Sequence, residues 1–412
     1  MNVILRGPLL SISGYGEHSR QVFQWAESRG WNIFSHVLPW GMNPYFINPD
    51  AQNGLIGRIM ATTNPLPPGE HNKAQLSFQI QLPNEWDPTI ARVNIGITAG
   101  VETTVCNPEW VQACNRMDHI VVPSEFTRKV FIDAGLSPNR ISSIPEAFTC
   151  DLNETEGSIA LSNNMENIPT KFNLLVFGQI TGQDPETDRK NTFYNIKWLA
   201  EVFQNDPDVG IIIKTNTGRL NVKDREQSTA ILRELLSQVR RGPGPRFYLA
   251  HGLMDESEIA SLYRHESVKA LVAPTRGEGW GLPILDAAVC GLPVIATNWS
   301  GHLDFMKQVK FLSLDYDMVP VPAHKIDNQI FMNGAQWANV KEGHFKSRLT
   351  KFRKSSGPPT EWAQSAAPQI AKDFSLKNIF SIYNEKLAAV LPTEHKAPMT
   401  FGMPGGGRID GT

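Results

Sequence analysis

Residues 273–305 read APTRGEGWGLPILDAAVCGLPVIATNWSGHLDF, and this stretch decides the fold class. A buried strand over residues 270–273 leads into a loop with three glycines. Pro283 suits a first helical turn, and apolar residues then recur at helical spacing until Gly291 ends the helix. A second apolar strand follows over residues 293–297. Strand, glycine loop, helix and strand in this order form the crossover unit from which parallel sheets are built.

The loop of this unit has the composition of an anion-binding site. It lies at the carboxyl end of a parallel strand, where small residues let backbone amides approach a ligand closely. The helix N-terminus behind it favours a negative charge. Two carboxylates, Glu278 in the loop and Asp286 two helical turns later, are expected to bracket the site from roughly the same face. Carboxylates beside a phosphate pocket bind neutral hydroxyls, which fits a nucleotide sugar, whose diphosphate lies between two polyols.

The sequence GEGWGLPILDAAVCGLPVIAT, residues 277–297, resembles retaining glycosyltransferases of the GT-B fold, in particular family 4, the glycosyl transferases group 1. In that family a Glu, seven residues and a second Glu contact the donor sugar and the ribose, so the resemblance assigns these roles to Glu278 and Asp286. Asp286 departs from the pattern because its side chain is one methylene shorter. From the residues alone, the alternative is an ordinary crossover with a glycine turn. The resemblance is strong over residues 265–305 and weaker elsewhere.

The resemblance also implies which groups bind the donor and take part in catalysis. In the family a basic pair neutralises the donor diphosphate, which corresponds here to Arg189 and Lys190. The family's Arg stands several positions before the Lys, where this chain has Gln179. A fixed cation lowers the barrier because the leaving nucleoside diphosphate gains charge as the glycosidic bond breaks. The expected catalytic residues are Glu278, Lys190 and Glu102. The expected donor-binding residues are Gly14, Gly16, Arg189, Lys190, Lys214, Glu278, Gly279, Trp280, Gly281, Leu282 and Asp286.

The N-terminal segment repeats strand, glycine turn and helix in weaker form. Residues 3–5 indicate a strand, the Ser-Gly-Tyr-Gly of residues 13–16 a turn, and residues 19–29 an amphipathic helix. A dinucleotide-binding fold requires a third glycine and an acid about 20 residues later, and their absence argues against an NAD enzyme. The resemblance places the turn opposite the donor diphosphate. His18 beside it is more often a cap or a surface residue than a catalytic group.

Glu102 follows the strand predicted over residues 92–98 and has two interpretations. A carboxylate at a strand end can take the proton of an acceptor hydroxyl, as the resemblance suggests for this position. Equally, Glu102 can cap the helix that follows. Ser124 is interpreted as a helix cap, because no His and acid pair accompanies it. The irregular segment over residues 41–92 is where acceptors are expected to bind, because loops on a rigid scaffold carry specificity.

The length, the composition and the net charge of the chain indicate its number of domains and its broad class. At 412 residues the chain is longer than one hydrophobic core normally serves, which predicts two domains. Hydrophobic and charged fractions of 41% and 19% are typical of a soluble globular protein. A formal net charge of −2 does not indicate a nucleic-acid binder.

Cysteine usage and hydropathy bear on the cellular location. The four cysteines form no CxxC pair, which favours reduced thiols and a cytoplasmic protein over a zinc site or disulfide framework. The N-terminus reads as a buried strand, with Arg6 in its short apolar run, and not as a signal peptide. No apolar run approaches the roughly 20 residues that span a bilayer, so any membrane contact is expected to be peripheral.

Two Asp-x-Asp strings raise the question of a metal. Residues 206–208 and 315–317 each lie where a turn is predicted, and Asp and Pro favour turns for backbone reasons. Neither string neighbours the glycine loop in sequence. We therefore expect a metal-independent enzyme without a cofactor, with the nucleoside diphosphate sugar as co-substrate.

The combined prediction is an α/β protein of GT-B type, with two Rossmann-like domains that face one another across a cleft. Residues 1–165 are assigned to an acceptor-side domain, to which a C-terminal helix over residues 375–391 crosses back. Residues 170–374 are assigned to the nucleotide-sugar domain, and residues 392–412 to a flexible tail. The predicted reaction is the retaining transfer of a sugar to a hydroxyl acceptor, most simply a saccharide or glycan.

Three alternatives stay open. The first is a GT-B transferase that glycosylates modified nucleic acid bases. Its one indication is a basic helix with Lys341, Lys346, Arg348, Lys351, Arg353 and Lys354, whose ordinary interpretation is a solvated face. The second is a phosphorylase or epimerase of the same fold. The third is a sugar-nucleotide-binding protein without transfer activity, which the presence of both acids and the lysine argues against.

Overall fold

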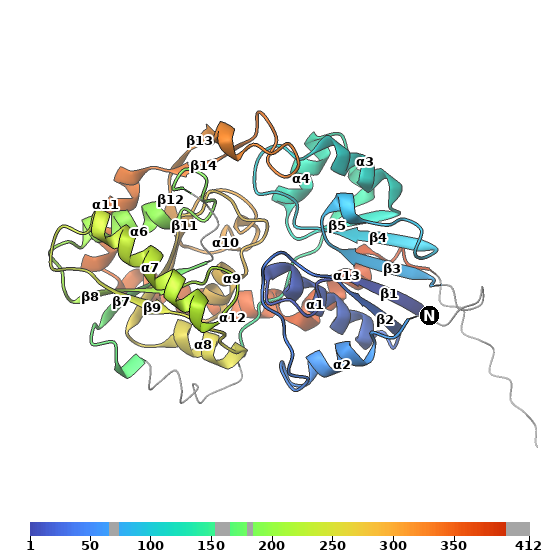
Figure 1. The fold of residues 1–412 in the computed structure, drawn as a ribbon, viewed down its shortest axis with the longest axis horizontal. Coiled ribbons are helices and arrows are strands. Elements are labelled where there is room, and N and C mark those ends of the chain that lie inside the picture. Colours follow the sequence, from blue (N-terminus) through green and yellow to red (C-terminus); the bar gives the residue numbers. More distant parts are fainter. Residues whose placement is uncertain (66–73, 153–164, 179–183, 393–412) are drawn as a thin grey trace, which may run out of the picture.

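The computed structural model describes residues 1–65, 74–152, 165–178 and 184–392, and it contains two six-stranded parallel sheets (Figure 1). The first sheet has the order β2-β1-β3-β4-β5-β6. Its strands are β1 (Asn2–Gly7), β2 (Asn32–Val37), β3 (Leu76–Ile80), β4 (Val93–Ile97), β5 (His119–Val122) and β6 (Ile141–Ser143). Its helices are α1 (Gly14–Ser28), α2 (Leu55–Ala61), α3 (Pro108–Arg116) and α4 (Glu125–Asp133). Short 3-10 helices span Pro83–Glu85 and Pro138–Arg140.

The second sheet has the order β12-β11-β10-β7-β8-β9. Its strands are β7 (Phe172–Phe177), β8 (Val209–Lys214), β9 (Arg246–Ala250), β10 (Val268–Ala273), β11 (Val294–Thr297) and β12 (Leu312–Leu314). Its helices are α6 (Thr192–Val202), α7 (Val222–Val239), α8 (Glu256–Arg264), α9 (Leu282–Val289), α10 (Leu303–Met306) and α11 (Glu342–Lys354). An antiparallel hairpin of β13 (Tyr316–Pro320) and β14 (Gln336–Val340) and a 3-10 helix (Ala323–Lys325) complete this half.

Strand composition accounts for the parallel sheets. β8 reads VGIIIK and is buried along its whole length, as expected for a strand with helices on both faces. The predicted unit around the glycine loop is present as β10, α9 and β11, and β10 pairs in parallel with β11. The structure therefore confirms the predicted fold class.

Both sheets contain a point where the chain order reverses. In the second sheet β7 and β10 are hydrogen-bonded neighbours although β8 and β9 separate them in sequence. In the first sheet β1 pairs with both β2 and β3. At such a switch point the loops after the two strands diverge and leave a crevice at their carboxyl ends. The loops after β7 and β10 carry Lys190 and Glu278, so the second switch point holds the predicted donor site.

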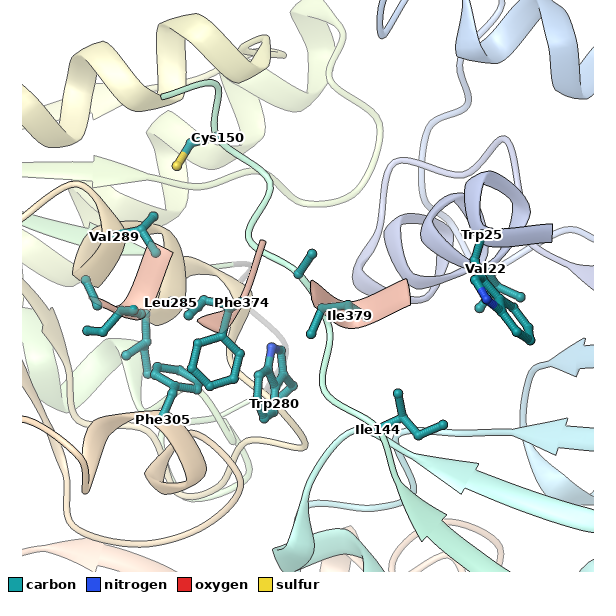
Figure 2. Packing of buried hydrophobic residues seen from close by; sticks show 14 of the residues in the cluster. Val22, Trp25, Ile144, Cys150, Trp280, Leu285, Val289, Phe305, Phe374 and Ile379 are labelled. Carbon is teal, nitrogen blue, oxygen red and sulfur yellow. The ribbon is translucent and has the colours of Figure 1, made fainter. Parts of the chain in front are cut away.

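The C-terminal helices connect the two halves. α12 (Gly357–Asp373) packs against α9, and α13 (Leu376–Lys386) reaches the first domain, where the Asn384 side chain accepts a hydrogen bond from Trp25 Nε1 at 3.0 Å. A continuous apolar cluster follows this path from Trp25 past Ile379 to Trp280 and Phe305 (Figure 2). The two domains therefore share buried surface beside the cleft.

The predicted glycine turn near the N-terminus is wrong. α1 begins at Gly14, not at residue 19, because the Ser13 side chain caps the helix by accepting a hydrogen bond from the Gly16 amide at 3.1 Å. A Cβ on Gly16 would lie 2.0 Å from the carbonyl oxygen of Ser11. Gly16 thus lets the first turn of α1 pack closely against the backbone at Ser11, and it does not make a turn.

Other expectations concern the membrane and the tail. Among the described residues, no helix is both long and apolar enough to cross a membrane. The expected flexible tail, apart from its first residue, and Gln179 lie outside the described residues.

Candidate active site

A cavity of about 500 Å³ lies between the carboxyl ends of the two sheets. Its first-domain wall includes Gly14, Tyr15, His18, Trp40, Glu102 and Glu146. Its second-domain wall includes Arg189, Lys190, Glu278, Gly279, Trp280, Gly281 and Leu282. An adjoining cavity of about 320 Å³ shares Gly14 and Leu282 with it and is also lined by Lys214 and Asp286. Apart from Gly16, every predicted site residue therefore lines one of these two cavities.

Lys190 and Glu278 form the central contact of the second-domain wall. The Lys190 ammonium donates to both carboxylate oxygens of Glu278, at 2.7 and 2.8 Å, and Arg189 Nη1 lies 3.6 Å from one of them. Burial acts to raise the pKa of Glu278, but the charges of Lys190 and Arg189 outweigh it and hold the pKa below its ordinary value. Glu278 is therefore an anion at neutral pH although its side chain is buried.

The loop that carries Glu278 is fixed from both domains. The Glu278 amide donates to Ser300 Oγ at 2.9 Å, and its carbonyl accepts from the Gly301 amide at 2.9 Å. A Cβ on Gly277 would lie 2.4 Å from the carbonyl oxygen of Glu102, so glycine is needed where the loops of the two domains meet. A Cβ on Gly279 would likewise lie 3.0 Å from the carbonyl oxygen of Ala99, so the glycines on both sides of the carboxylate allow this packing.

Arg189 connects the two walls. Its Nη2 lies 3.2 Å from Glu102 Oε1 in the first domain, and its Nη1 donates to the Gly277 carbonyl at 2.7 Å in the second. The cap of α3 is Asn107, whose side chain accepts from the Glu109 amide. Glu102 is therefore not the helix cap, and it faces the cavity as an ion-pair partner of Arg189.

The sequence led us to expect Asp286 beside Glu278, but Asp286 does not line the main cavity. Its two oxygens accept hydrogen bonds from the Thr149 amide at 2.7 Å and the Thr149 hydroxyl at 2.6 Å. Burial raises the pKa of Asp286 to about 6, although the hydrogen bonds from Thr149 act to lower it. The two acids face adjoining cavities because Glu278 precedes the helix whereas Asp286 lies within it.

Lys214 ends β8 and faces the adjoining cavity, where its ammonium donates to the Gly252 carbonyl. Burial lowers its pKa. Trp280 is buried and packs edge-on against Phe305 with ring centroids 5.0 Å apart, so it belongs to the apolar cluster as well as to the cavity wall.

His18 is buried and is neither a cap nor a surface residue, contrary to expectation. Its Nε2 shares a hydrogen bond of 3.0 Å with the Tyr383 hydroxyl of α13, and its Nδ1 lies 3.6 Å from Glu146. Burial lowers the pKa of His18 to about 4 and raises that of Glu146 to about 8. Both side chains are therefore neutral at pH 7.

Several residues that form or support the site were not predicted from the sequence. Trp40 and Glu146 line the cavity, and each lies three residues after the end of a strand, β2 and β6 respectively. Arg276 is buried, stacks 5.3 Å from the Trp337 ring and donates its backbone amide to the Arg189 carbonyl at 2.8 Å. Arg276 adjoins the glycine loop in sequence, but its contact with Arg189, 87 residues earlier, gives no local signal.

Three of the six basic residues of the nucleic-acid alternative, which lie in α11 or at its N-cap, pair with acids of their own domain. Lys346 contacts Glu201 at 2.6 Å, and Arg353 and Lys341 pair with Asp206 and Asp317 of the two Asp-x-Asp strings at 2.8 and 2.9 Å. Within the described ranges, no group of three or more His, Cys, Asp or Glu side chains has the arrangement of a metal site.

Residues 221–315 match the family model described as glycosyl transferases group 1. The search of curated proteins found no match. Similar solved structures include HepE from Anabaena in complex with UDP and glucose, with 13% identity, a TM-score of 0.62, and coverage of 94% of this chain and 100% of that one. The trehalose-6-phosphate synthase OtsA has 8% identity and a TM-score of 0.62, with 95% of this chain and 100% of that one covered.

A further similar structure is WaaG, a glycosyltransferase involved in lipopolysaccharide biosynthesis, with 13% identity, a TM-score of 0.56, and coverage of 95% of this chain and 99% of that one. At such low identities the similarity establishes a shared fold. The match to the group 1 model lies inside the second domain, and the solved structures show that the whole chain has the two-domain GT-B fold of these glycosyltransferases.

Proposed function

We propose that this protein transfers a glycosyl group from a nucleoside diphosphate sugar to an acceptor hydroxyl, with retention of anomeric configuration and without a metal ion. The acceptor we propose is a saccharide or glycan. The observation that carries the proposal is the contact of the Lys190 ammonium with both oxygens of buried Glu278, beside Arg189, in a cavity lined by both domains.

The charges suit the departure of a nucleoside diphosphate. As the bond between the anomeric carbon and the phosphate oxygen breaks, its electron pair stays on the diphosphate, and fixed cations stabilise the added charge. Lys190 and Arg189 supply those cations. Glu278, an anion at neutral pH, accepts hydrogen bonds from the hydroxyls of the donor sugar.

Glu102 is the proposed partner of the acceptor hydroxyl. Retention in a single step requires the acceptor oxygen to approach the anomeric carbon on the face from which the diphosphate leaves. Glu102 lies on the first-domain wall and contacts Arg189, so it stands close to the cation expected at the diphosphate. From there it can receive the proton that the acceptor oxygen loses as the new glycosidic bond forms.

The test is a panel of nucleoside diphosphate sugars assayed for nucleotide release in the presence of EDTA. UDP-glucose is the first choice because the HepE structure contains UDP and glucose. We expect one donor to raise the Tm and to be consumed with EDTA present, and NMR to show the donor's anomeric configuration in the product. A panel in which no donor raises the Tm or releases nucleotide would overturn the proposed function. Loss of activity in EDTA, or an inverted product, would overturn the respective part of it.

A further inference from the structure

We propose that Trp40, backed by Tyr15, is an aromatic platform on which a saccharide acceptor stacks in the cleft; this inference rests on the proposed function. Trp40 lies in the loop after β2, is half-buried and lines the main cavity. Its ring stacks on Tyr15, with centroids 4.2 Å apart and an interplanar angle of 29°. The roles proposed for Lys190, Arg189 and Glu278 in donor binding do not involve these two stacked rings, which lie on the first-domain wall.

The platform is held rigidly. The Trp40 amide donates to the Tyr45 hydroxyl at 2.8 Å, and the Trp40 carbonyl accepts from the Asn43 side chain at 2.9 Å. The Tyr15 hydroxyl shares a hydrogen bond of 2.9 Å with Thr98 and accepts one from the Ala99 amide at 3.0 Å. These bonds hold the Trp40 backbone and the Tyr15 ring behind it in place, so little conformational freedom is lost when a ligand stacks on Trp40, which favours binding.

The position of the platform relates it to the reacting centre. Thr98 and Ala99, which hold Tyr15, directly follow β4 and precede Glu102 on the same loop. Glu102 contacts Arg189, which lies 3.6 Å from Glu278. The aromatic pair therefore belongs to the first-domain wall, opposite the carboxylate proposed to hold the donor sugar. A ring stacked on Trp40 lies on the side from which an acceptor hydroxyl would approach.

The surrounding groups favour a saccharide over other ligands. A pyranose ring presents a C–H face, which packs on the electron-rich face of an indole, and a rim of hydroxyls. Asn43, His18 and Glu146 line the same cavity and offer hydrogen bonds to that rim. Burial keeps His18 and Glu146 neutral at pH 7, which suits uncharged hydroxyls. A strongly anionic acceptor is disfavoured because the wall also carries the Glu102 carboxylate.

The experiment measures binding of methyl α-D-glucopyranoside, maltose and cellobiose to the UDP-bound protein by saturation-transfer NMR. We expect saturation of the ring C–H protons of at least one saccharide, an increase in its Kd of about 10-fold in Trp40→Ala, and a smaller increase in Trp40→Phe. Trp362→Ala removes a half-exposed tryptophan outside the cleft and is the matched control. The rise in Tm caused by UDP is expected to be the same in all variants.

Three results would overturn the platform. One is that none of the three saccharides gives a signal that depends on Trp40. Another is that Trp40→Ala and Trp362→Ala weaken saccharide binding equally. The last is that Trp40→Ala abolishes the Tm rise caused by UDP, because the ring would then stack on the nucleobase. Saccharide binding is measured without turnover, so its failure is distinguishable from a failure of donor consumption.

Discussion

The two walls of the cleft differ in charge. The second-domain wall carries Lys190, Arg189 and Glu278 within hydrogen-bond or ion-pair distance of one another. The first-domain wall carries stacked Tyr15 and Trp40 and the pair His18 and Glu146, which burial keeps neutral. The difference fits the proposed roles, in which the charged wall binds the diphosphate and the largely neutral wall binds the hydroxyl acceptor. Glu102 is the charged exception on the first wall, and it is the residue that contacts Arg189.

The largest effect that separates the walls is expected from Glu102→Gln. The substitution removes the proposed base and should lower turnover at least about 100-fold. UDP should bind at least as tightly as before, because Arg189 loses a competing carboxylate. Steady-state kinetics and calorimetric titration with UDP measure the two effects. The control is Asn107→Ala, which removes the true cap of α3 and should cost about 1 kcal/mol of stability without a comparable loss of turnover.

Glu278→Gln tests the opposite wall. The amide keeps the shape of the side chain but loses the charge that accepts hydroxyl hydrogen bonds, so kcat/KM for the donor should fall about 10- to 100-fold. UDP itself should bind at least as tightly as before, because Lys190 loses its competing carboxylate. Titration with UDP and kinetics with the donor distinguish the two outcomes. Weaker UDP binding would show that Glu278 holds the nucleotide and not the sugar.

Gly277→Ala tests how closely the walls must meet. The added Cβ would lie 2.4 Å from the Glu102 carbonyl oxygen, so the loops must separate. We expect the free energy of unfolding to fall by about 1–3 kcal/mol, and turnover to fall as well. Gly343→Ala is the matched control, because a Cβ there meets no atom within 4 Å. Equal stability of the two variants in urea unfolding would contradict the close packing.

The smallest expected effect is the change in stability with pH that His18 and Glu146 cause. Burial raises the pKa of folded Glu146 to about 8, above its ordinary value, so its contribution to stability is present at low pH and is lost as pH rises towards 8. His18, whose pKa is lowered to about 4, destabilises only when pH falls below its unfolded value. Between pH 6.5 and 8 the wild type should therefore lose about 1 kcal/mol or more relative to Glu146→Gln. Urea titrations test this, and the same difference in unfolding free energy between the wild type and Glu146→Gln at both pH values would refute it.

The second-domain wall was largely predictable from the sequence. The strand, glycine loop and helix around Glu278 are encoded by local periodicity and by Pro283 and Gly291, and the resemblance to known transferases supplied Lys190. The placement of Asp286 was not predictable, because Thr149, which bonds both of its oxygens, is 137 residues away in sequence.

The first-domain wall was mostly not predictable for the same physical reason. Trp40 faces the cavity because β2 pairs with β1, and His18 is buried because α13 returns to the first domain 365 residues later. The start of α1 was missed because the glycines suggested a turn, whereas the Ser13 cap stabilises a helix there. Local patterns predict elements, but neutral residues that come together over long sequence distances leave little local signal.

The contact between Lys190 and Glu278 carries the proposed function, and a comparison of two lysine variants tests its role. UDP affinity and turnover are measured for Lys190→Ala and for Lys197→Ala, which removes a lysine on α6 that pairs with Glu201 outside the cavity. We expect Lys190→Ala to bind UDP more weakly and to lose about 100- to 1000-fold in turnover, while Lys197→Ala resembles the wild type. Full turnover and UDP affinity in Lys190→Ala would contradict this expectation.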